Sequence, residues 1–313
     1  MSKYEIYEKL GKGAFSTVFA GRNGNDGNSI VAVKIVKSKN IDPGRISKEI
    51  KALSLRPVHD NLLNLLEYFP FRSSIFIVTD YCVCSLLKII KNPSERSSLT
   101  ISQVNQVIFQ VFSGVDHLHK NGFIHCDIKS SNILVTAEGN LKIADFGEVR
   151  EVPLYGSLKL SHPVGTPGYQ APEVKNPPFV ITFCVDYYSI GATICHLVTG
   201  DLPFKRDFNE NLIKLVKTKS IFPEEKPEKS LLNFPKKFVE IEKYVKLFLD
   251  KDIQKRIQGY RLWKTEKEDF SKGTPFPKKS AKLGRTLSKK EFDKYCPLGS
   301  LSTKLISEIR ENI

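Results

Sequence analysis

The sequence lacks the features that would place the chain in a membrane or outside the cell. No apolar run approaches the roughly 18–20 residues that a transmembrane helix needs. Residues 1–6 contain no apolar signal core, and Ser2 stands where N-myristoylation requires a glycine. We therefore expect no membrane span and a location in the cytoplasm, the nucleus or both.

Cysteines are few, and their spacing matches no metal-binding pattern. The chain has six, of which Cys82 and Cys84 form a C-x-C pair with no second pair at zinc spacing. We expect reduced, mostly buried thiols. The length of 313 residues allows one two-lobed unit or two ordinary domains with a sizeable core.

Acidic residues are outnumbered, which gives a net charge of +14. Residues 261–313 hold 13 basic and 7 acidic side chains, so the last sixth of the chain carries nearly half of the excess. A basic balance favours attraction to ATP, acidic substrates, nucleic acid or anionic lipid, and a surface tuned for solubility explains it at least as well. The interrupted lysines between 278 and 290 form a weak basic patch, and whether it directs the chain to the nucleus stays open. We expect no specific nucleic-acid binding.

The hydrophobic pattern changes along the chain. Up to about residue 81 it predicts short strands and one helix. That helix begins at Asp42-Pro43, with Asp42 as its N-cap. Further on, apolar residues recur at helical spacing. The predicted strands are 30–36, 62–69, 74–79, 133–136 and 141–144, and the predicted later helices are 102–120, 186–198 and 239–249.

The last residues have a different texture. Residues 271–299 are rich in Pro, Gly and Lys and predict an extended tail. Residues 300–313 regain helical periodicity, which predicts a terminal helix. That helix either packs on its own domain or docks a partner, and the sequence favours neither.

One short run of polar residues indicates chemistry. It contains His125, Asp127, Lys129 and Asn132, and Asp145-Phe146-Gly147 begins 18 residues after Asp127. Phosphoryl transfer from ATP needs one carboxylate to orient the attacking hydroxyl and accept its proton, and a second to hold magnesium ions. Seven specified residues, each about one in twenty by composition, rarely recur by chance at this spacing. The two motifs resemble the catalytic loop and the metal-binding Asp-Phe-Gly of protein kinases.

The resemblance covers about residues 4–262. Residues 11–18 resemble the glycine-rich loop G-x-G-x-x-G-x-V, with Ser16 in place of the third glycine, and residues 31–34 resemble the V-A-I-K strand. Residues 165–173 resemble G-T-x-x-Y-x-A-P-E, which ends a kinase activation segment, and Asp186 begins a helix like the family's D-x-W-S-x-G.

The family implies an α+β, two-lobed protein kinase fold. The N-terminal lobe, about 4–81, would be a small antiparallel sheet with one helix. The C-terminal lobe, about 82–262, would be larger and mainly helical. A basic extension with a terminal helix, residues 263–313, would follow.

The resemblance also implies roles for individual residues. Asp127 would be the catalytic base, Lys129 would stabilise the transferring phosphoryl, and Asn132 and Asp145 would hold Mg²⁺, which prefers hard oxygen ligands. Nucleotide binding would use Gly11, Lys12, Gly13, Ala14, Phe15, Ser16, Val18, Ala32, Lys34, Glu49, Thr79, Asp80 and Cys82. The activation segment would use Phe146, Gly147, Thr166 and Glu173, and structural roles would fall to Asp186 and to Arg256, the partner of Glu173.

Some of these roles can be stated more closely. Lys34 would hold the α- and β-phosphates and pair with Glu49. Thr79 aligns with the gatekeeper, and backbone groups near Asp80 and Cys82 would bond the adenine edge. Thr166 would bridge the catalytic aspartate and lysine.

The sequence departs from the family at positions that bind the activation-loop phosphate or the substrate. Cys126 replaces the arginine that in many kinases grips an activation-loop phosphate, so we predict little dependence on phosphorylation of that segment. Ser131 and His196 replace glutamates of basophilic kinases, so we predict no strong preference for arginine two residues before the target. Candidate phosphorylation sites are Tyr155, Ser157, Ser161 and Thr166.

We therefore expect an ATP- and Mg²⁺-dependent serine/threonine protein kinase acting on protein substrates. In the family, a lysine at the position of Lys129 marks serine/threonine specificity. A kinase-fold scaffold without activity is the alternative that Cys126 and Ser16 keep open. A small-molecule or lipid kinase is disfavoured by Ala171-Pro172-Glu173. The subfamily loosely resembles the calcium/calmodulin-dependent and checkpoint-kinase branches.

Overall fold

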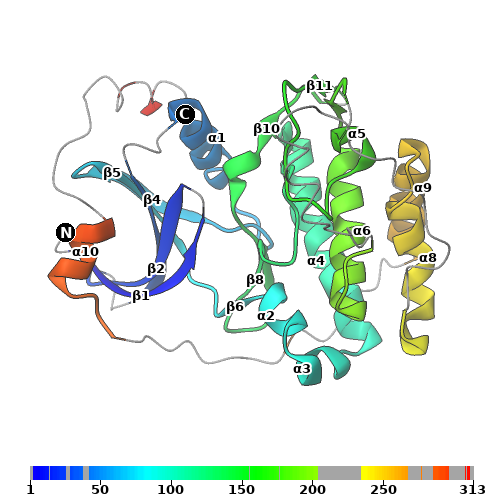
Figure 1. The fold of residues 1–313 in the computed structure, drawn as a ribbon, viewed down its shortest axis with the longest axis horizontal. Coiled ribbons are helices and arrows are strands. Elements are labelled where there is room, and N and C mark those ends of the chain that lie inside the picture. The colour runs from blue at the N-terminus through cyan, green and yellow to red at the C-terminus, as the bar shows by residue number, and fades with distance from the viewer. Residues whose placement is uncertain are drawn as a thin grey trace, which may run out of the picture. The chain divides into compact units, whose positions relative to one another are not determined.

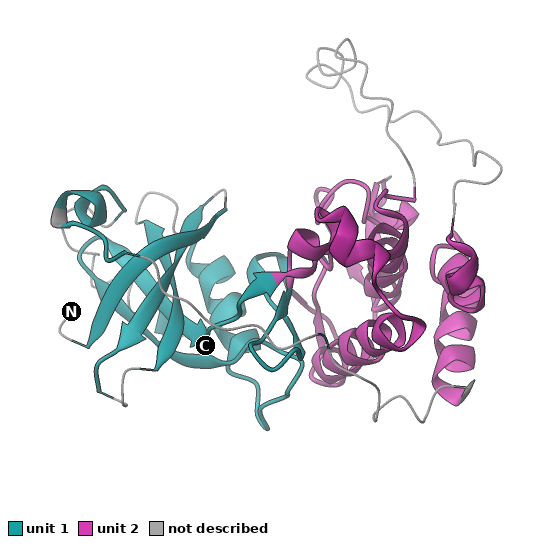
Figure 2. Ribbon diagram, turned by 90° about the horizontal axis from the view of Figure 1, so that it is seen from below, with its two compact units in different colours: residues 1–84, 134–149, 276–313 teal, residues 85–133, 150–275 magenta. Residues whose placement is uncertain are grey.

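The computed structural model describes residues 3–13, 15–25, 29–37, 42–154, 156–175, 177–203, 234–266, 276, 285–295, 307 and 309–310. The chain divides into two compact units (Figure 2). Unit 1 comprises residues 1–84, 134–149 and 276–313, and unit 2 comprises residues 85–133 and 150–275.

Unit 1 is built on a five-stranded antiparallel sheet with the order β1-β2-β3-β5-β4 (Figure 1). Its strands are β1 (Tyr4–Lys12), β2 (Ser16–Asn23), β3 (Ile30–Lys37), β4 (Leu65–Phe71) and β5 (Ser74–Asp80). Helix α1 (Pro43–Leu53) follows β3. Asp42 Oδ1 accepts hydrogen bonds from Gly44 N at 3.1 Å and Arg45 N at 3.4 Å, so the predicted N-cap is confirmed.

A strand pair joins unit 1 from a later part of the chain. β8 (Ile133–Val135) and β9 (Leu141–Ile143) form a three-stranded sheet with β6 (Cys84–Ser85), in the order β6-β8-β9. Leu63 N donates to Ile143 O at 2.8 Å, and Asn61 Nδ2 donates to Leu141 O at 3.0 Å. These bonds hold residues 134–149, which include the 3-10 turn η2 (Phe146–Glu148), in unit 1.

The prediction of an extended tail for residues 271–299 is wrong in part. Residues 289–295 form helix α10 (Lys289–Tyr295), which lies beside the sheet of unit 1 (Figure 1). Hydrophobic burial outweighs the Pro- and Lys-rich surroundings here, because Phe292 is packed into the core of that unit. The terminal helix expected at 300–313 falls mostly outside the described residues, although 307, 309 and 310 are helical.

Unit 2 is mainly helical. Its central helices are α4 (Ile101–Lys120) and α6 (Cys184–Thr199), with α8 (Val239–Phe248) and α9 (Ile253–Glu266) packed beyond them. Thr100 and Gln103 form a capping box at the start of α4. Shorter elements complete it: α2 (Leu86–Ile90), α3 (Pro93–Ser97), β7 (Phe123–Ile124), β10 (Arg150–Glu151), β11 (Leu158–Lys159), α5 (Pro172–Lys175), β12 (Val180–Ile181) and η3 (Lys236–Phe238).

An aromatic cluster joins the helices of unit 2. The ring of Phe112, on α4, lies 5.6 Å from that of Tyr187, 5.2 Å from that of Phe248 and 5.2 Å from that of Trp263, measured between centroids. Because these rings come from α4, α6, α8 and α9, their packing holds the four helices together. This helical core supports the loops of unit 2, which carry polar residues.

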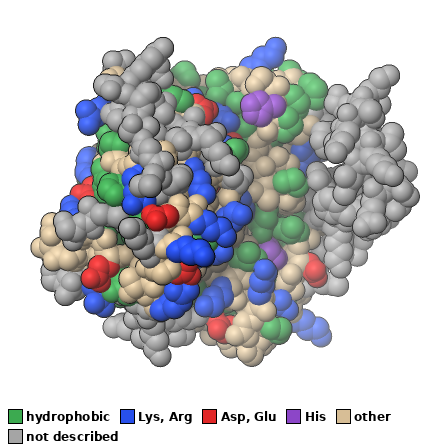
Figure 3. Space-filling model, turned by 60° about the vertical axis from the view of Figure 1, so that its left-hand side comes forward, with side chains coloured by type: hydrophobic (Ala, Val, Ile, Leu, Met, Phe, Trp, Pro, Cys, Tyr) green, Lys and Arg blue, Asp and Glu red, His purple; other side chains and the backbone are tan. Residues whose placement is uncertain are grey.

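Basic side chains are prominent on one face of the described part of the chain. Figure 3 shows Lys and Arg side chains spread over the described part of one face, with fewer acidic ones between them, in keeping with the net charge of +14. Among the described residues, no helix combines the length and the apolar character that crossing a bilayer would require.

Candidate active site

Unit 1 brings Lys34 and Glu49 together. Lys34 lies on β3 and Glu49 on α1, and Lys34 Nζ is 2.5 Å from Glu49 Oε1. Asp145 Oδ1 is 3.3 Å from the same nitrogen. Burial acts to lower the pKa of Lys34, but the two carboxylates outweigh it and hold the pKa above its ordinary value. Lys34 is therefore a permanently charged ammonium group, suited to an anionic ligand.

Asp145 has an unusual backbone conformation. Its φ of 63° lies in the left-handed region, which non-glycine residues seldom adopt. The turn that follows is tied to α1, because Arg45 Nη2 donates to Glu148 Oε1 at 2.7 Å. Phe146 is buried beneath this turn. The Asp145 side chain itself is 53% exposed, so its carboxylate is accessible to a cation.

The glycine-containing loop joins β1 to β2. Gly13 N donates to Ser16 O at 2.9 Å, which closes the turn. A Cβ built on Gly11 would meet nothing within 4 Å, so the backbone is open on that side. Val18 pairs in register with Lys34 on β3. Ala14, which was predicted to belong to the nucleotide site, lies outside the described residues.

The predicted hinge begins at the end of β5. Thr79 is buried and stands opposite Ala32 in the strand register. Asp80 is anchored, because its amide donates to Asn64 O at 3.3 Å and its carboxylate pairs with Lys142 at 3.1 Å. Burial raises the pKa of the Cys82 thiol to about 12, so this thiol stays protonated at neutral pH.

Unit 2 assembles the polar residues of the loop after β7 into one network. Lys129 Nζ is 2.6 Å from Asp127 Oδ2 and 2.7 Å from Thr166 Oγ1. Thr166 Oγ1 donates to Asp127 Oδ1 at 2.6 Å. Asn132 Nδ2 donates to the carbonyl of Asp127 at 3.0 Å and to its Oδ2 at 3.2 Å. Three residues, up to 39 positions away in the chain, therefore converge on the carboxylate of Asp127.

A buried carboxylate holds the backbone of this loop. Asp186, at the start of α6, has no exposed surface and accepts from His125 N and Cys126 N, both at 2.9 Å. His119 Nε2 lies 2.8 Å from its Oδ2. Cys126 has a φ of 65°, a backbone conformation that is energetically unfavourable for a residue other than glycine. The hydrogen bonds to Asp186 offset that energetic cost. Asp186, for which the resemblance implies a structural role, therefore holds the loop backbone through these bonds.

The end of the segment 165–173 is fastened at two points. Arg256 is fully buried, and its Nη2 lies 2.9 Å from both carboxylate oxygens of Glu173. Gly165 has a φ of +82°, and a Cβ there would come within 2.3 Å of the carbonyl oxygen of Cys126. Only glycine permits this close approach, which places the neighbouring Thr166 against the loop.

Cys126 belongs to an apolar cluster under the same segment. It is buried together with Ile124, Val152 and Val164, and Leu158 packs on them from outside. Its thiol donates a weak hydrogen bond to Ile124 O at 3.7 Å. Apolar side chains therefore fill the position where the family resemblance implies an arginine.

A family model described as protein kinase domain matches residues 4–266. The chain belongs to the protein kinase family. It is similar to cyclin-dependent kinase-like 4 of Mus musculus, with 32% identity over 67% of this chain and 61% of that protein. It is also similar to CBL-interacting serine/threonine-protein kinase 8 of Arabidopsis thaliana, with 34% identity over 65% of this chain and 46% of that protein. Serine/threonine-protein kinase TOS3 of Saccharomyces cerevisiae shares 29% identity over 82% of this chain and 51% of its own length.

These relatives identify the kinase as a eukaryotic-type serine/threonine kinase, and the two-lobed kinase fold predicted from the sequence is confirmed. They come from several branches, so the resemblance to two particular branches stays a prediction. The chain spans between 40% and 61% of the length of the first curated relatives that it matches.

Sequence reasoning missed one polar network of this kinase. Ser130 Oγ lies 2.9 Å from Tyr169 OH and 3.2 Å from His196 Nδ1, and Tyr169 OH lies 2.6 Å from that nitrogen. Burial lowers the pKa of His196, which favours the neutral imidazole, and its Nδ1 shares one hydrogen bond with the tyrosine hydroxyl. The network joins the catalytic loop, the segment 165–173 and α6. The sequence indicates His196 only as the replacement of a glutamate.

Proposed function

We propose that this kinase transfers the γ-phosphoryl of ATP to serine and threonine hydroxyls of proteins. The observation that carries the proposal is the convergence of Lys129, Thr166 and Asn132 on Asp127 within unit 2. Such an arrangement suits phosphoryl transfer, in which a protein contributes mainly positioning and electrostatic stabilisation. The activity, its substrates and its partners are part of this proposal.

Asp127 is suited to be the base. An ionised carboxylate offers about four lone-pair sites, and bonds from Lys129, Thr166 and Asn132 use three of them. The remaining lone pair would receive the proton of the substrate hydroxyl. As the bond from that hydroxyl oxygen to the γ-phosphorus forms, the bond from phosphorus to the ADP oxygen breaks. Lys129, at 2.6 Å from Asp127, would stabilise the charge on the transferring group.

The residues present also fit a nucleotide with Mg²⁺. The Lys34 ammonium and the open backbone at Gly11 provide a cation and an uncovered turn for phosphates. In unit 2, Asn132 uses its amide nitrogen on Asp127, and its oxygen, which accepts a hydrogen bond from Ser131 Oγ at 3.3 Å, keeps a second lone pair for a metal. In unit 1, Asp145 offers an exposed carboxylate. Mg²⁺ is commonly held by one or two such oxygens together with phosphates, and it would neutralise charge on those phosphates.

The apolar cluster around Cys126 supports activity without activation-segment phosphorylation. In many kinases an arginine at this position must find a phosphate before the segment orders. Here Val164 lies in the buried cluster that contains Cys126, Leu158 packs against that cluster, and the Glu173–Arg256 pair fastens the end of the segment. None of these contacts needs a phosphate. Ser157, Ser161 and Thr166 remain candidate phosphorylation sites, and Tyr155 lies outside the described residues.

The substrate preference is also proposed. Ser131 and the neutral His196 offer no negative charge at the positions where basophilic kinases carry glutamate, so arginine two residues before the target is not selected. A peptide array with each residue at that position tests this. Strong enrichment of arginine there would refute it.

The proposed activity is tested with radiolabelled ATP, Mg²⁺ and peptide pools that carry only Ser, Thr or Tyr as acceptor. We expect label on the Ser and Thr pools, and a loss of roughly 10²–10⁴-fold for Asp127→Asn, the usual worth of a general base. Asp60→Asn, which alters an exposed aspartate, is the control and should keep the wild-type rate. If the wild type and Asp127→Asn label the pools equally, the proposal is wrong and a kinase-fold scaffold is the better description.

A further inference from the structure

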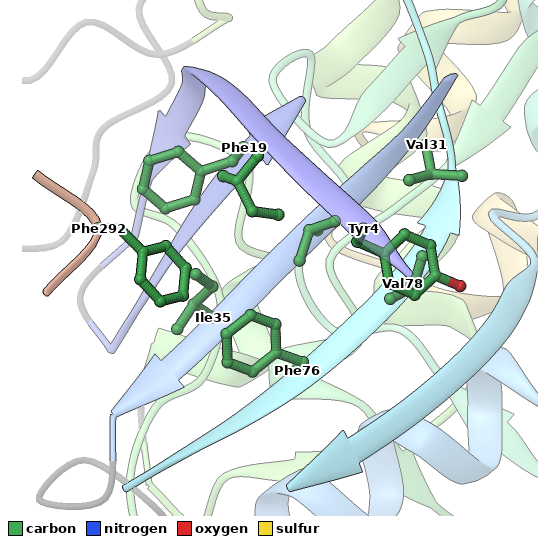
Figure 4. Close-up of a cluster of buried hydrophobic side chains, with 9 residues drawn as sticks. Tyr4, Phe19, Val31, Ile35, Phe76, Val78 and Phe292 are labelled. Carbon is green, nitrogen blue, oxygen red and sulfur yellow. The ribbon is translucent and has the colours of Figure 1, made fainter. Parts of the chain in front are cut away.

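A segment beyond the family match lies against the sheet of unit 1. This segment, residues 285–295, is called the cap below. Phe292 is only 6% exposed and belongs to the same buried cluster as Phe19 and Phe76 (Figure 4). The centroids of the Phe292 and Phe76 rings are 6.4 Å apart, and the Tyr295 ring meets that of Phe19 edge-on at 4.8 Å. The cap therefore completes the hydrophobic core of unit 1.

An ion pair fixes the position of the cap on the sheet of unit 1. Arg72 Nη1 lies 2.6 Å from Asp293 Oδ1. The same guanidinium lies 5.5 Å from the centroid of the Phe292 ring, within the range of a cation–π contact. Arg72 sits in the turn between β4 and β5, so one residue binds both the charge and the ring of the cap.

Backbone atoms of the cap are also bonded to the sheet. Leu287 N donates to Ile6 O on β1 at 3.0 Å. Lys37 Nζ, at the end of β3, donates to Lys294 O at 2.8 Å. Together with Arg72, these contacts attach the cap to β1, to β3 and to the turn after β4.

Side-chain hydrogen bonds cap the first turn of helix α10, but the helix is too short to be stable alone. Ser288 Oγ and Ser288 N both donate to Glu291 Oε2, at 2.8 Å and 3.0 Å, and Arg285 Nη1 donates to the same oxygen at 2.9 Å. A helix of seven residues needs tertiary packing, because isolated helices shorter than about 12–15 residues are marginal in water. The sheet supplies that packing.

The cap covers the face of the sheet opposite the Lys34 side chain. Val33 and Ile35 on β3 belong to the same buried cluster as Phe292, and Figure 4 shows Ile35 beside Phe292. Because side chains alternate along a strand, Lys34 points to the other face. Lys34 reaches Glu49 on α1 from that other face. The cap thus supports the strand directly behind the ion pair.

The chain after unit 2 touches unit 1 at two further places. Phe276 N donates to Gly139 O at 3.3 Å, and Gly139 has a φ of +92° where a Cβ would come within 1.9 Å of Phe276 O. Ser47, on α1, donates to Ile309 O at 3.1 Å, and Ile309 is buried. The extension therefore contacts both the sheet that carries Lys34 and the helix that carries Glu49.

We propose that the aromatic face formed by Phe19, Phe71 and Phe76 is a docking surface whose occupant is the cap of the same chain. Docking braces β3 against α1 and so positions the Lys34–Glu49 pair. Phe292 and Arg72 are positioning residues, since neither touches the reacting groups. The docking stands by itself, whereas its effect on catalysis rests on the proposed function.

The test uses the full chain with two independent changes. Phe292→Ala removes the buried ring. Arg72→Asp places two carboxylates against each other, and the swap Arg72→Asp with Asp293→Arg restores opposite charges. Aspartate suits position 72, because Arg72 has a φ of 54° and aspartate tolerates that region. Val239→Ala, at an exposed apolar residue of unit 2, is the matched control.

Amide hydrogen exchange reports docking without any need for activity. We expect exchange of β2, β3 and α1 amides to rise on the order of tenfold in Phe292→Ala and in Arg72→Asp, and to return in the charge swap, while α4 and α6 amides stay unchanged. In an active kinase, KM for ATP should rise several-fold in the same variants while KM for the peptide stays constant.

Two results would overturn the proposal. The first is unchanged exchange of β3 in both single variants, which would mean that the cap does not brace the sheet. The second is increased amide exchange with an unaltered KM for ATP, which would mean that docking of the cap does not position the Lys34–Glu49 pair. If the wild type itself transfers no phosphoryl group, the proposed function fails, and the exchange measurement still decides the docking.

Discussion

The two units hold their polar residues in different ways. In unit 2, the Asp127 network is fixed by bonds among a single loop, the segment 165–173 and the first turn of α6, all on a helical core. In unit 1, Lys34 and Glu49 lie on a sheet and a helix whose far sides contact residues from the end of the chain. The catalytic loop is therefore supported locally, whereas the ion pair depends on a segment about 250 residues away, as the Lys37–Lys294 bond illustrates.

Removing a buried charge from unit 2 should have the largest effect on the local support that distinguishes this unit from unit 1. Arg256→Met leaves Glu173 without its partner, and breaking a buried ion pair in this way costs about 3–5 kcal/mol. We expect the free energy of unfolding to fall by that amount in urea titrations. Lys255→Met, beside it in sequence, removes an exposed pair with Asp250 and should cost less than about 1 kcal/mol. Equal losses for the two variants would show that the Glu173–Arg256 pair adds no local support.

A smaller and more specific change is Thr166→Val. It keeps the shape of the side chain and removes the hydroxyl that joins Lys129 to Asp127. Hydrogen bonds to charged groups contribute about 1.5–3 kcal/mol, so kcat should fall by roughly 10- to 150-fold. Thr166→Ser, which keeps the hydroxyl, should retain most of the rate. A Thr166→Val enzyme with wild-type kcat would exclude the bridge from the mechanism.

The smallest expected effect is a pH dependence that arises from His196. Burial lowers the pKa of His196, Asp201 acts to raise it, and the positive charges of Arg96 and Lys91 lower it further. The hydrogen-bond partners of the ring are Tyr169 and Ser130. The fold therefore favours the neutral ring. Its contribution is complete above the ordinary pKa of 6.5 and is lost as the pH falls through 6.5 toward the lower pKa of the folded state.

Urea titrations at pH 7.5 and pH 5.5 measure this contribution. The wild type should lose up to about 1 kcal/mol more on acidification than His196→Gln, which accepts a hydrogen bond without titrating. An equal loss in the two proteins would mean that protonation of His196 does not weaken the network.

Local motifs predicted much of this molecule. The pattern around Asp127 and Asp145 indicated the family, and the capped start of α1 at Asp42 followed from residue types alone. The pairings of Lys34 with Glu49 and of Glu173 with Arg256 were expected from motif positions, and the structure brings both pairs together. The roles of these residues in catalysis remain part of the proposed function.

Other features could not be predicted, because they depend on tertiary contacts. The sequence predicts an extended tail where the cap lies, because a seven-residue helix gives too short a pattern and its stability comes from the sheet. The assignment of residues 134–149 to unit 1 depends on backbone bonds such as that from Leu63 to Ile143, which carry no side-chain signature. The spacing of Phe292 and Tyr295, three residues apart, was the one available signal for the cap.

The most direct test of local support in unit 2 is the first-turnover rate of kinase that carries no phosphate on its activation segment. The protein would be dephosphorylated to homogeneity, checked by mass spectrometry, and mixed rapidly with ATP, Mg²⁺ and peptide. Cys126 lies among apolar side chains and provides no positive charge for a phosphate to bind. We therefore predict that the dephosphorylated protein reacts at a rate within about tenfold of that of the phosphorylated protein. A larger loss on dephosphorylation would contradict the account.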